Sequence, residues 1–181
     1  MKATGIVRRI DDLGRVVIPK EIRRTMRIRE GDPLEIFTDR DGEVIFKKYS
    51  PIGELGTFAS QYAETLSKTS GYPICITDKD NVIAVSGASK KEFSDKKISD
   101  ELEKVMEEKT TFMMTSPSSQ KIPVIDGSNK YVAGLICPII SEGDTIGSVV
   151  FLADEDTKGL GEVEEKLAKS AAGFLGRQME Q

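Results

Sequence analysis

The chain has 181 residues, of which 38% are hydrophobic and 31% are charged, and its formal net charge is −4. This composition is typical of a soluble globular protein of one or two domains. No apolar run reaches the roughly 18 residues that a membrane-spanning helix needs, and charge appears early at the N-terminus, so we expect a cytoplasmic protein with no membrane partner. The sequence contains no histidine, the commonest general base and metal ligand. We therefore expect no catalytic site, no metal site and no cofactor.

Arginine is concentrated at one end of the chain. Eight of the nine arginines lie in the first forty residues, and the ninth is Arg177, whereas lysine is spread along the whole length. Residues 1–29 carry nine basic and three acidic side chains, a net +6, while residues 49–181 carry fourteen basic and twenty-one acidic ones, a net −7. Because the planar guanidinium fork matches phosphate oxygens and the guanine edge, this segregation indicates nucleic-acid binding. The alternative is a solvated basic face without a partner.

The first fifty residues predict short strands around one short helix. The strands follow from β-branched runs, the helix from the spacing of Ile22 and Met26, and a hairpin from the Asp41-Gly42 turn signal. Four short strands and a two-turn helix cannot bury a core, so we infer that two copies complete one barrel. The expected elements are strands at 4–10 and 15–19, a helix at 20–28, and hairpin strands at 34–37 and 44–46.

The same residues resemble the AbrB-type transition-state regulators. The resemblance is carried by the segments Thr4-Gly5-Ile6-Val7-Arg8, Asp12-Leu13-Gly14-Arg15-Val16-Val17-Ile18-Pro19, Glu21-Ile22-Arg23-Arg24 and Lys47-Lys48-Tyr49. It implies a swapped-hairpin β-barrel formed by two chains, which binds double-stranded DNA. The DNA-contacting arginines of the family fall on Arg8, Arg15, Arg23 and Arg24, and Arg9 occupies a position that is basic in relatives.

Elementary geometry agrees with this assignment. Gly14 allows a tight turn from which Arg15 projects, and Arg23 and Arg24 lie on the exposed face of the short helix. For each arginine the alternative role is a salt bridge to a local acid, with Asp11, Asp12 and Glu21 as candidates.

Two segments, 54–68 and 162–179, carry apolar side chains at helical spacing. Each helix either packs on its own sheet or joins a helical bundle between protomers. We favour the bundle, because the two helices bracket the intervening domain in sequence, and with it a homotetramer built from barrel dimers. The residues expected at this oligomerisation surface are Leu55, Phe58, Tyr62, Leu66, Leu167 and Phe174.

Between these helices the pattern alternates strands and helices. Residues 72–78 and 82–85 predict a hairpin, 98–109 a helix, and 111–114, 132–140 and 146–152 further strands. The order is similar to a GAF domain, which often senses a small molecule. The fold class is thus α+β, with an AbrB-like domain at 1–50, a linker helix at 51–70 and a GAF-like α/β sheet domain at 71–181.

The loops at 116–120 and 126–129 either line a pocket for an unidentified ligand or are ordinary surface loops.

Over its whole length the chain resembles sporulation regulators of endospore-forming bacteria. The resemblance implies a sequence-specific DNA-binding transcription regulator, acting as activator and repressor, whose C-terminal domain assembles and regulates it. The alternative is an antitoxin, in which the same barrel binds DNA and the tail neutralises a toxin. Such a tail is short and flexible, whereas residues 54–181 have the periodicity of a folded domain. An enzyme is a third alternative, weakened by the missing histidine.

Overall fold

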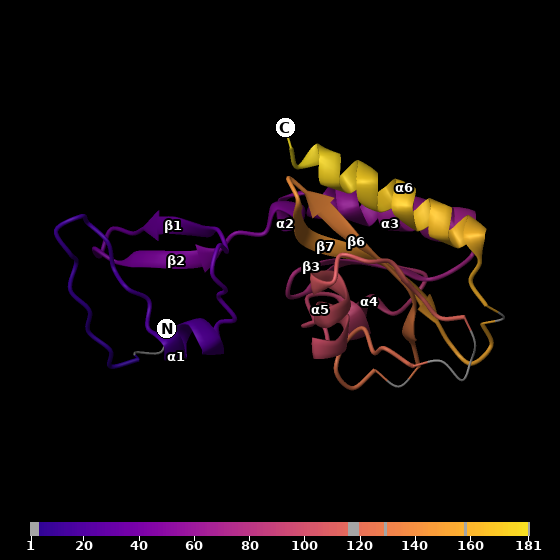
Figure 1. Ribbon diagram of the computed structural model, residues 1–181, viewed down its shortest axis with the longest axis horizontal. Coiled ribbons are helices and arrows are strands. Elements are labelled where there is room, and N and C mark those ends of the chain that lie inside the picture. The colour runs from indigo at the N-terminus through magenta and orange to yellow at the C-terminus, as the bar shows by residue number, and fades with distance from the viewer. Residues whose placement is uncertain (1–3, 116–119, 129, 158, 181) are drawn as a thin grey trace. The chain divides into compact units, whose positions relative to one another are not determined.

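The computed structural model describes residues 4–115, 120–128, 130–157 and 159–180. It divides into two compact units, Met1–Tyr49 and Ser50–Gln181. We call them the N-terminal unit and the C-terminal unit. Both expected hairpins and the mixed helix and sheet composition are present (Figure 1).

The N-terminal unit contains one short helix and one hairpin. In the hairpin, Ile36 pairs with Phe46 in an antiparallel ladder. The turn is held by the Asp39 carboxylate, whose Oδ1 accepts hydrogen bonds from the backbone amides of Asp41 and Glu43 at 3.0 and 2.9 Å. The elements are α1 at Lys20–Thr25, β1 at Leu34–Thr38 and β2 at Val44–Lys48.

The strands expected at 4–10 and 15–19 do not form within this single chain. Both segments are extended, and their residues are exposed except Ile18, which is half-buried, and Pro19, which is buried. The backbone amide of Asp11 donates to the Arg15 carbonyl at 3.0 Å at the turn between them. A strand is defined by a ladder partner, and no other segment in the described part of this unit pairs with either one. The helix expected at 20–28 is also shorter, because Arg27 adopts a left-handed backbone (φ 51°) and ends it.

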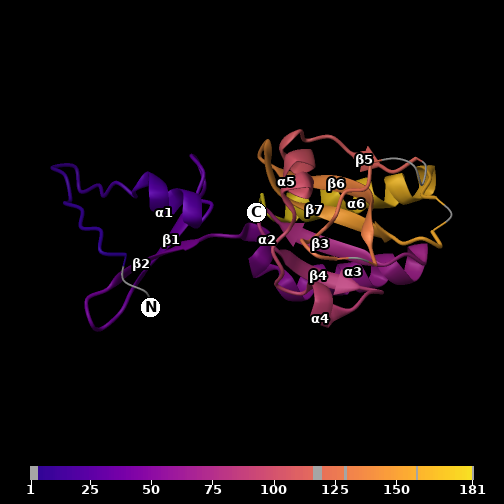
Figure 2. The same cartoon turned by 90° about the horizontal axis from the view of Figure 1, so that it is seen from below.

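The C-terminal unit is a five-stranded antiparallel sheet in the order β4-β3-β7-β6-β5. Helices α3 and α6 cover one face, and α4 and α5 lie on the other (Figures 1 and 2). The short helix α4 is not among the elements expected from the sequence, and the helix expected at 51–70 is divided into α2 and α3. The elements are α2 Pro51–Glu54, α3 Gly56–Ser70, β3 Ile74–Asp78, β4 Val82–Ser86, α4 Lys90–Phe93, α5 Asp100–Glu107, β5 Phe112–Met113, β6 Val132–Ser141, β7 Asp144–Ala153 and α6 Glu162–Gln178.

Both faces of the sheet are apolar, which explains its continuous hydrophobic strands. On β3, Ile74 and Ile76 belong to the core under α3 and α6, while Cys75 between them belongs to the core under α4 and α5. This follows from the two-residue alternation of side chains along a strand. The central strands are therefore buried on both sides, and Phe151 on β7 is fully buried.

Helix α3 lies inside the C-terminal unit rather than between the two units. Its residues Ala59, Ala63 and Leu66 are buried in the core that includes sheet residues. The residues expected to form a linker helix therefore contribute to the core of the C-terminal unit.

The first residue of the C-terminal unit is fixed to its sheet by side-chain hydrogen bonds. The Ser50 hydroxyl accepts from the Gly53 amide at 3.0 Å, which caps α2, and donates to Asp78 Oδ2 at 2.8 Å. The other oxygen of Asp78 accepts from the amides of Asp80 and Asn81 at 2.7 and 2.6 Å. A largely buried carboxylate at the β3–β4 turn thus holds the start of α2.

Helix α6 approaches the sheet very closely at its C-terminal end. The buried residues on α6 are small for most of its length: Ala168, Ala171, Ala172 and Gly176, together with Leu175. A Cβ atom at Gly176 would collide with the backbone carbonyl oxygen of Ile140 on β6. Close helix–sheet contact at this point therefore requires glycine.

Candidate nucleic-acid interface

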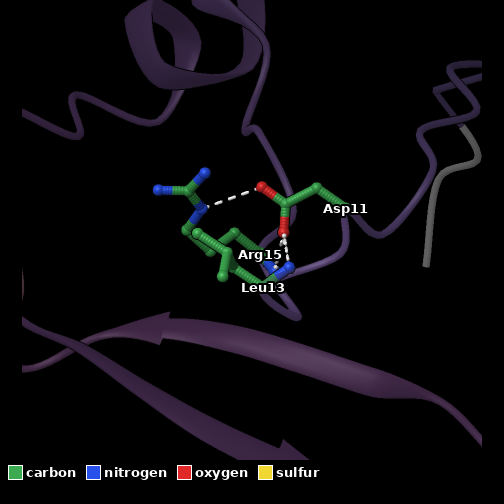
Figure 3. Close-up of polar contacts among 3 residues, drawn as sticks. All are labelled: Asp11, Leu13 and Arg15. Carbon is green, nitrogen blue, oxygen red and sulfur yellow. Dashed lines mark hydrogen bonds and ion pairs between the residues drawn. The ribbon is translucent and has the colours of Figure 1, made fainter.

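The loop that carries Arg15 is organised by Asp11. Asp11 Oδ1 accepts hydrogen bonds from the backbone amides of Leu13 (3.0 Å) and Arg15 (2.7 Å), and Oδ2 accepts from Arg15 Nε at 2.8 Å (Figure 3). Gly14 has φ +75°, a left-handed conformation that glycine adopts without strain, and its amide donates to the Asp11 carbonyl at 3.1 Å. The Arg15 side chain is nevertheless 69% exposed. The loop presents Arg15 to solvent from a hydrogen-bonded base.

The charge of Asp11 is stabilised by the same contacts. The hydrogen bond from the Arg15 backbone amide, and next the one from the Arg15 side chain, hold the pKa of Asp11 below its ordinary value of 3.8. Asp11 is therefore a carboxylate at neutral pH.

Arg23 and Arg24 lie in the last turn of α1, and both are exposed. The helix begins after Pro19, whose missing amide costs nothing at a helix start. It closes with the Ile28 amide donating to the Arg23 carbonyl at 2.8 Å. The helix ending thus fixes the backbone of both arginines and leaves their side chains in solvent.

Arg8 and Arg9 lie in the extended segment that precedes the Asp11 loop, and both are exposed. In the part of the chain that the structure describes, Arg8, Arg9, Arg23 and Arg24 make no ion pair with a local acid, whereas Arg15 pairs with Asp11. The alternative role as a local salt bridge therefore holds for Arg15 alone. The other four guanidiniums are exposed on loop and helix.

The N-terminal unit also exposes apolar side chains on the hairpin and on the two extended segments. Phe37 and Phe46 are 41% and 43% exposed, Val7 is 86% exposed, and Val17 is 71% exposed. This much exposed apolar surface is unusual for a monomeric domain. It lies in the same unit as the arginines.

A second aromatic surface lies on α3 and α6. Phe58, Tyr62 and Phe174 form a cluster, with ring centroids 5.8 Å apart between Phe174 and each of the other two. Phe174 remains 41% exposed and Val163 on the same helix 66% exposed. Leu66, expected at this surface, is only 5% exposed and lies in the core of its own sheet. Leu55 and Leu167 are half-buried.

Comparison with known proteins identifies the family. Residues 54–180 match the family model "Stage V sporulation protein T C-terminal, transcription factor". The chain is 56% identical to stage V sporulation protein T of Bacillus subtilis (strain 168), over the full length of both proteins. The chain belongs to the stage V sporulation protein T family of transcription factors.

The N-terminal match is equally clear in sequence. Fifty-one residues, 28% of this chain and 52% of that relative, are 63% identical to the transition state regulatory protein AbrB of Bacillus subtilis (strain 168). Residues 7–53 also match the model "Antidote-toxin recognition MazE, bacterial antitoxin". That match ends at residue 53, just inside the C-terminal unit, which is a folded domain rather than a toxin-wrapping tail. The antitoxin alternative is the less supported one.

The C-terminal unit has the fold expected from the GAF resemblance. A GAF domain from an Acinetobacter phosphoenolpyruvate-protein phosphotransferase superposes with a TM-score of 0.58 and 12% identity, covering 69% of this chain and 81% of that one. At this identity the likeness concerns the fold alone. The prediction of a GAF-like sheet domain flanked by helices is confirmed.

The C-terminal unit has a cavity of about 300 Å³ beside α4, on the face of the sheet that α4 and α5 cover. The Ser128 hydroxyl donates to Glu92 Oε1 at 3.1 Å across its wall. Of the loops expected to line a pocket, 126–128 contributes here, while residues 116–119 and 129 lie outside the described residues. The lining residues are Glu92, Lys96, Lys97, Ile125, Asp126, Gly127 and Ser128.

Within the described ranges no three His, Cys, Asp or Glu side chains come together as a metal site, and no helix there is long and apolar enough to cross a membrane.

Proposed function

We propose that the chain is a sequence-specific DNA-binding transcription regulator of sporulation genes that acts in the cytoplasm as activator and repressor. DNA is bound by Arg8, Arg9, Arg15, Arg23 and Arg24. The observation that carries the proposal is that all five guanidiniums are exposed on one small unit, and that Arg15 stands on a hydrogen-bonded loop. Family membership and the 63% identity to AbrB over this unit support it.

We further propose that two N-terminal units interlock as a swapped-hairpin barrel. The support is the exposed apolar surface of the unit and the two extended segments, 4–10 and 15–19, which lack a strand partner among the described residues of their own chain. Two-fold symmetry then doubles the five arginines on one dimer.

A tetramer follows if the aromatic cluster on α3 and α6 joins two such dimers. Phe174→Glu would place a charge in that contact and is expected to halve the mass measured by light scattering. Ser60→Glu introduces the same charge at an exposed position of α3 and serves as the matched control. An unchanged mass for Phe174→Glu contradicts the proposed contact.

The cavity beside α4 is our proposed location for a regulatory small molecule. Its walls combine two lysines with two acidic residues, so they offer partners for both signs of charge. Binding there would stabilise the C-terminal unit by mass action, which a metabolite screen by thermal shift measures. A Lys97→Ala variant that keeps the whole shift of every hit contradicts this location.

The DNA-binding proposal is tested by titrating the full chain against two probes at several salt concentrations. One probe is a random-sequence duplex pool, and the other is the duplex that the wild-type chain enriches from that pool. Arg15→Ala and Arg23→Ala are each expected to weaken binding to the enriched duplex by about 1–3 kcal/mol if the side chain reaches a base edge. A phosphate contact would instead weaken both probes equally and flatten the log–log salt slope by about one unit.

Arg177→Ala is the internal control for this titration. Arg177 is exposed on α6, so its removal changes the net charge equally while leaving the N-terminal unit intact. If Arg177→Ala impairs binding as much as Arg15→Ala, the DNA surface lies elsewhere.

A further inference from the structure

The contact between Asp11 and Arg15 uses only one edge of the guanidinium. An arginine side chain carries five N–H donors, one on Nε and four on the two terminal nitrogens. Asp11 Oδ2 accepts from Nε at 2.8 Å, and in Figure 3 the dashed line from this oxygen runs to Nε and not to either terminal nitrogen. The fork that recognises a phosphate or the guanine O6 and N7 atoms is thus left available.

The carboxylate also fixes the backbone from which this side chain leaves. Its other oxygen receives both the Leu13 and the Arg15 amides, at 3.0 and 2.7 Å. One acidic side chain therefore holds the Arg15 main chain and the inner end of its guanidinium together. A long side chain that is exposed and otherwise mobile is held close to one direction before any ligand arrives.

We propose that Asp11 is a positioning residue for DNA binding, which holds Arg15 by its Nε and leaves the two terminal nitrogens to contact the DNA. The inference rests on the proposed DNA-binding function. It reverses the expectation from charge alone, because a carboxylate on a DNA-binding surface repels phosphate and its removal should strengthen binding. Pre-ordering Arg15 instead reduces the entropy lost on binding, and ordering one long side chain is worth about three- to tenfold in affinity.

Asp12, the neighbouring residue, provides the matched control. It carries the same charge on the same loop, and within residues 4–115 no hydrogen bond or ion pair joins it to Arg15. Asp12→Asn and Asp11→Asn therefore remove identical charge one residue apart. Asn at position 11 keeps a side-chain oxygen that can accept from the two backbone amides, so the loop retains those bonds while the charged contact to Nε is lost.

The experiment titrates full-length wild type, Asp11→Asn, Asp12→Asn, Arg15→Ala and Asp11→Asn/Arg15→Ala against the enriched duplex and the random duplex pool. Asp11→Asn is expected to weaken binding to the enriched duplex about three- to tenfold. Asp12→Asn is expected to leave binding unchanged or strengthen it slightly. In the Arg15→Ala background, Asp11→Asn should cost nothing, because the side chain that it positions is gone.

Two results overturn the inference. The first is Asp11→Asn binding as tightly as Asp12→Asn, which would leave Asp11 as a charge only. The second is Asp11→Asn costing as much without Arg15 as with it, which would mean that Asp11 shapes the loop and not the side chain. If the wild-type chain binds neither duplex, the proposed DNA-binding function is wrong. The wild-type titration therefore distinguishes failure of the proposed function from failure of the inference about Asp11.

Discussion

The N-terminal and C-terminal units differ in what they do with large hydrophobic side chains. Of the fifteen that are exposed among the described residues, twelve belong to the N-terminal unit and three, Ile140, Val163 and Phe174, to the C-terminal unit. The described hydrophobic core lies entirely within the C-terminal unit. A unit of about fifty residues cannot bury a sufficient core, whereas one of about 130 residues can. In the proposed assembly, association would complete the fold of the N-terminal unit, whereas it would only join C-terminal units that are already folded.

Separating the N-terminal unit from the rest of the chain is expected to have the largest effect on folding. A fragment of residues 1–53 is expected to fold only as a dimer, so that dissociation removes all of its structure and the unfolding midpoint falls on dilution. Sedimentation and circular dichroism across a concentration series measure both quantities. A compact, folded monomer at micromolar concentration would show that this unit folds without a partner.

Within the C-terminal unit, Phe151→Ala should be the most costly of the substitutions considered. Phe151 is fully buried on the central strand β7, so truncation removes its transfer free energy and leaves a cavity. The expected loss is about 3–5 kcal/mol in the free energy of unfolding. Chemical denaturation of the full chain at fixed concentration measures it. Phe46→Ala, whose side chain is 43% exposed in one chain, is the counterpart, and its cost should instead grow as the protein is diluted.

A smaller effect is expected at the start of the C-terminal unit. Ser50→Ala removes the cap of α2 and one hydrogen bond to the largely buried Asp78 carboxylate. We expect a loss of about 1–3 kcal/mol in the stability of this unit, measured by its thermal or chemical unfolding. Ser60→Ala, an exposed serine on α3 that bonds only the carbonyl four residues earlier, should be nearly neutral. Equal costs for the two variants would show that the Ser50–Asp78 contact contributes nothing.

The smallest expected effect is the pH dependence that arises from Asp11. The pKa of Asp11 is lower in the folded than in the unfolded chain. Ionised Asp11 therefore stabilises the folded state above the unfolded pKa of 3.8, and this stabilisation is lost as the pH falls through the lower folded pKa. Because Asp11 stays ionised, its titration should leave DNA binding unchanged between pH 6 and 8. An NMR titration of the Asp11 carboxyl should give a midpoint below 3.8, and it should stay low in Arg15→Ala because the backbone amide is the main cause. A midpoint above 3.8 would contradict the loop geometry.

The elements that the sequence predicted well are those with local causes. The hairpin around Asp41-Gly42 and the helices expected at 54–68 and 162–179 follow from turn chemistry and 3.6-residue spacing. The structure confirms them, with the helices at Gly56–Ser70 and Glu162–Gln178. The strands at 4–10 and 15–19 were wrong for a single chain, because ladder formation depends on a partner that periodicity does not reveal.

The candidate site divides in the same way. Exposure of Arg15, Arg23 and Arg24 was predictable from the loop and the short helix that carry them. The Asp11 contact entered the sequence reasoning only as an alternative to DNA binding, although an acid four residues before an arginine, with Gly14 between them, was a usable signal. The Ser50–Asp78 bond spans 28 residues and had no local signature. The prediction that Leu66 lies at the oligomerisation surface is wrong. Helical spacing identifies the apolar face of the helix, but it does not show which residues of that face the sheet covers.

The close contact of α6 with β6 has a consequence for how this protein can diverge. Gly176 and the alanines at 168, 171 and 172 hold the inner face of the helix flat, and any larger side chain at 176 meets the Ile140 carbonyl oxygen. That face also fixes the rotation of the helix about its axis, and so the direction in which Phe174 points. Substitutions at Val163 or Phe174, on the outer side of the helix, leave its contact with the sheet unchanged. The outer surface of the helix can therefore change over evolutionary time while the fold of its domain stays the same.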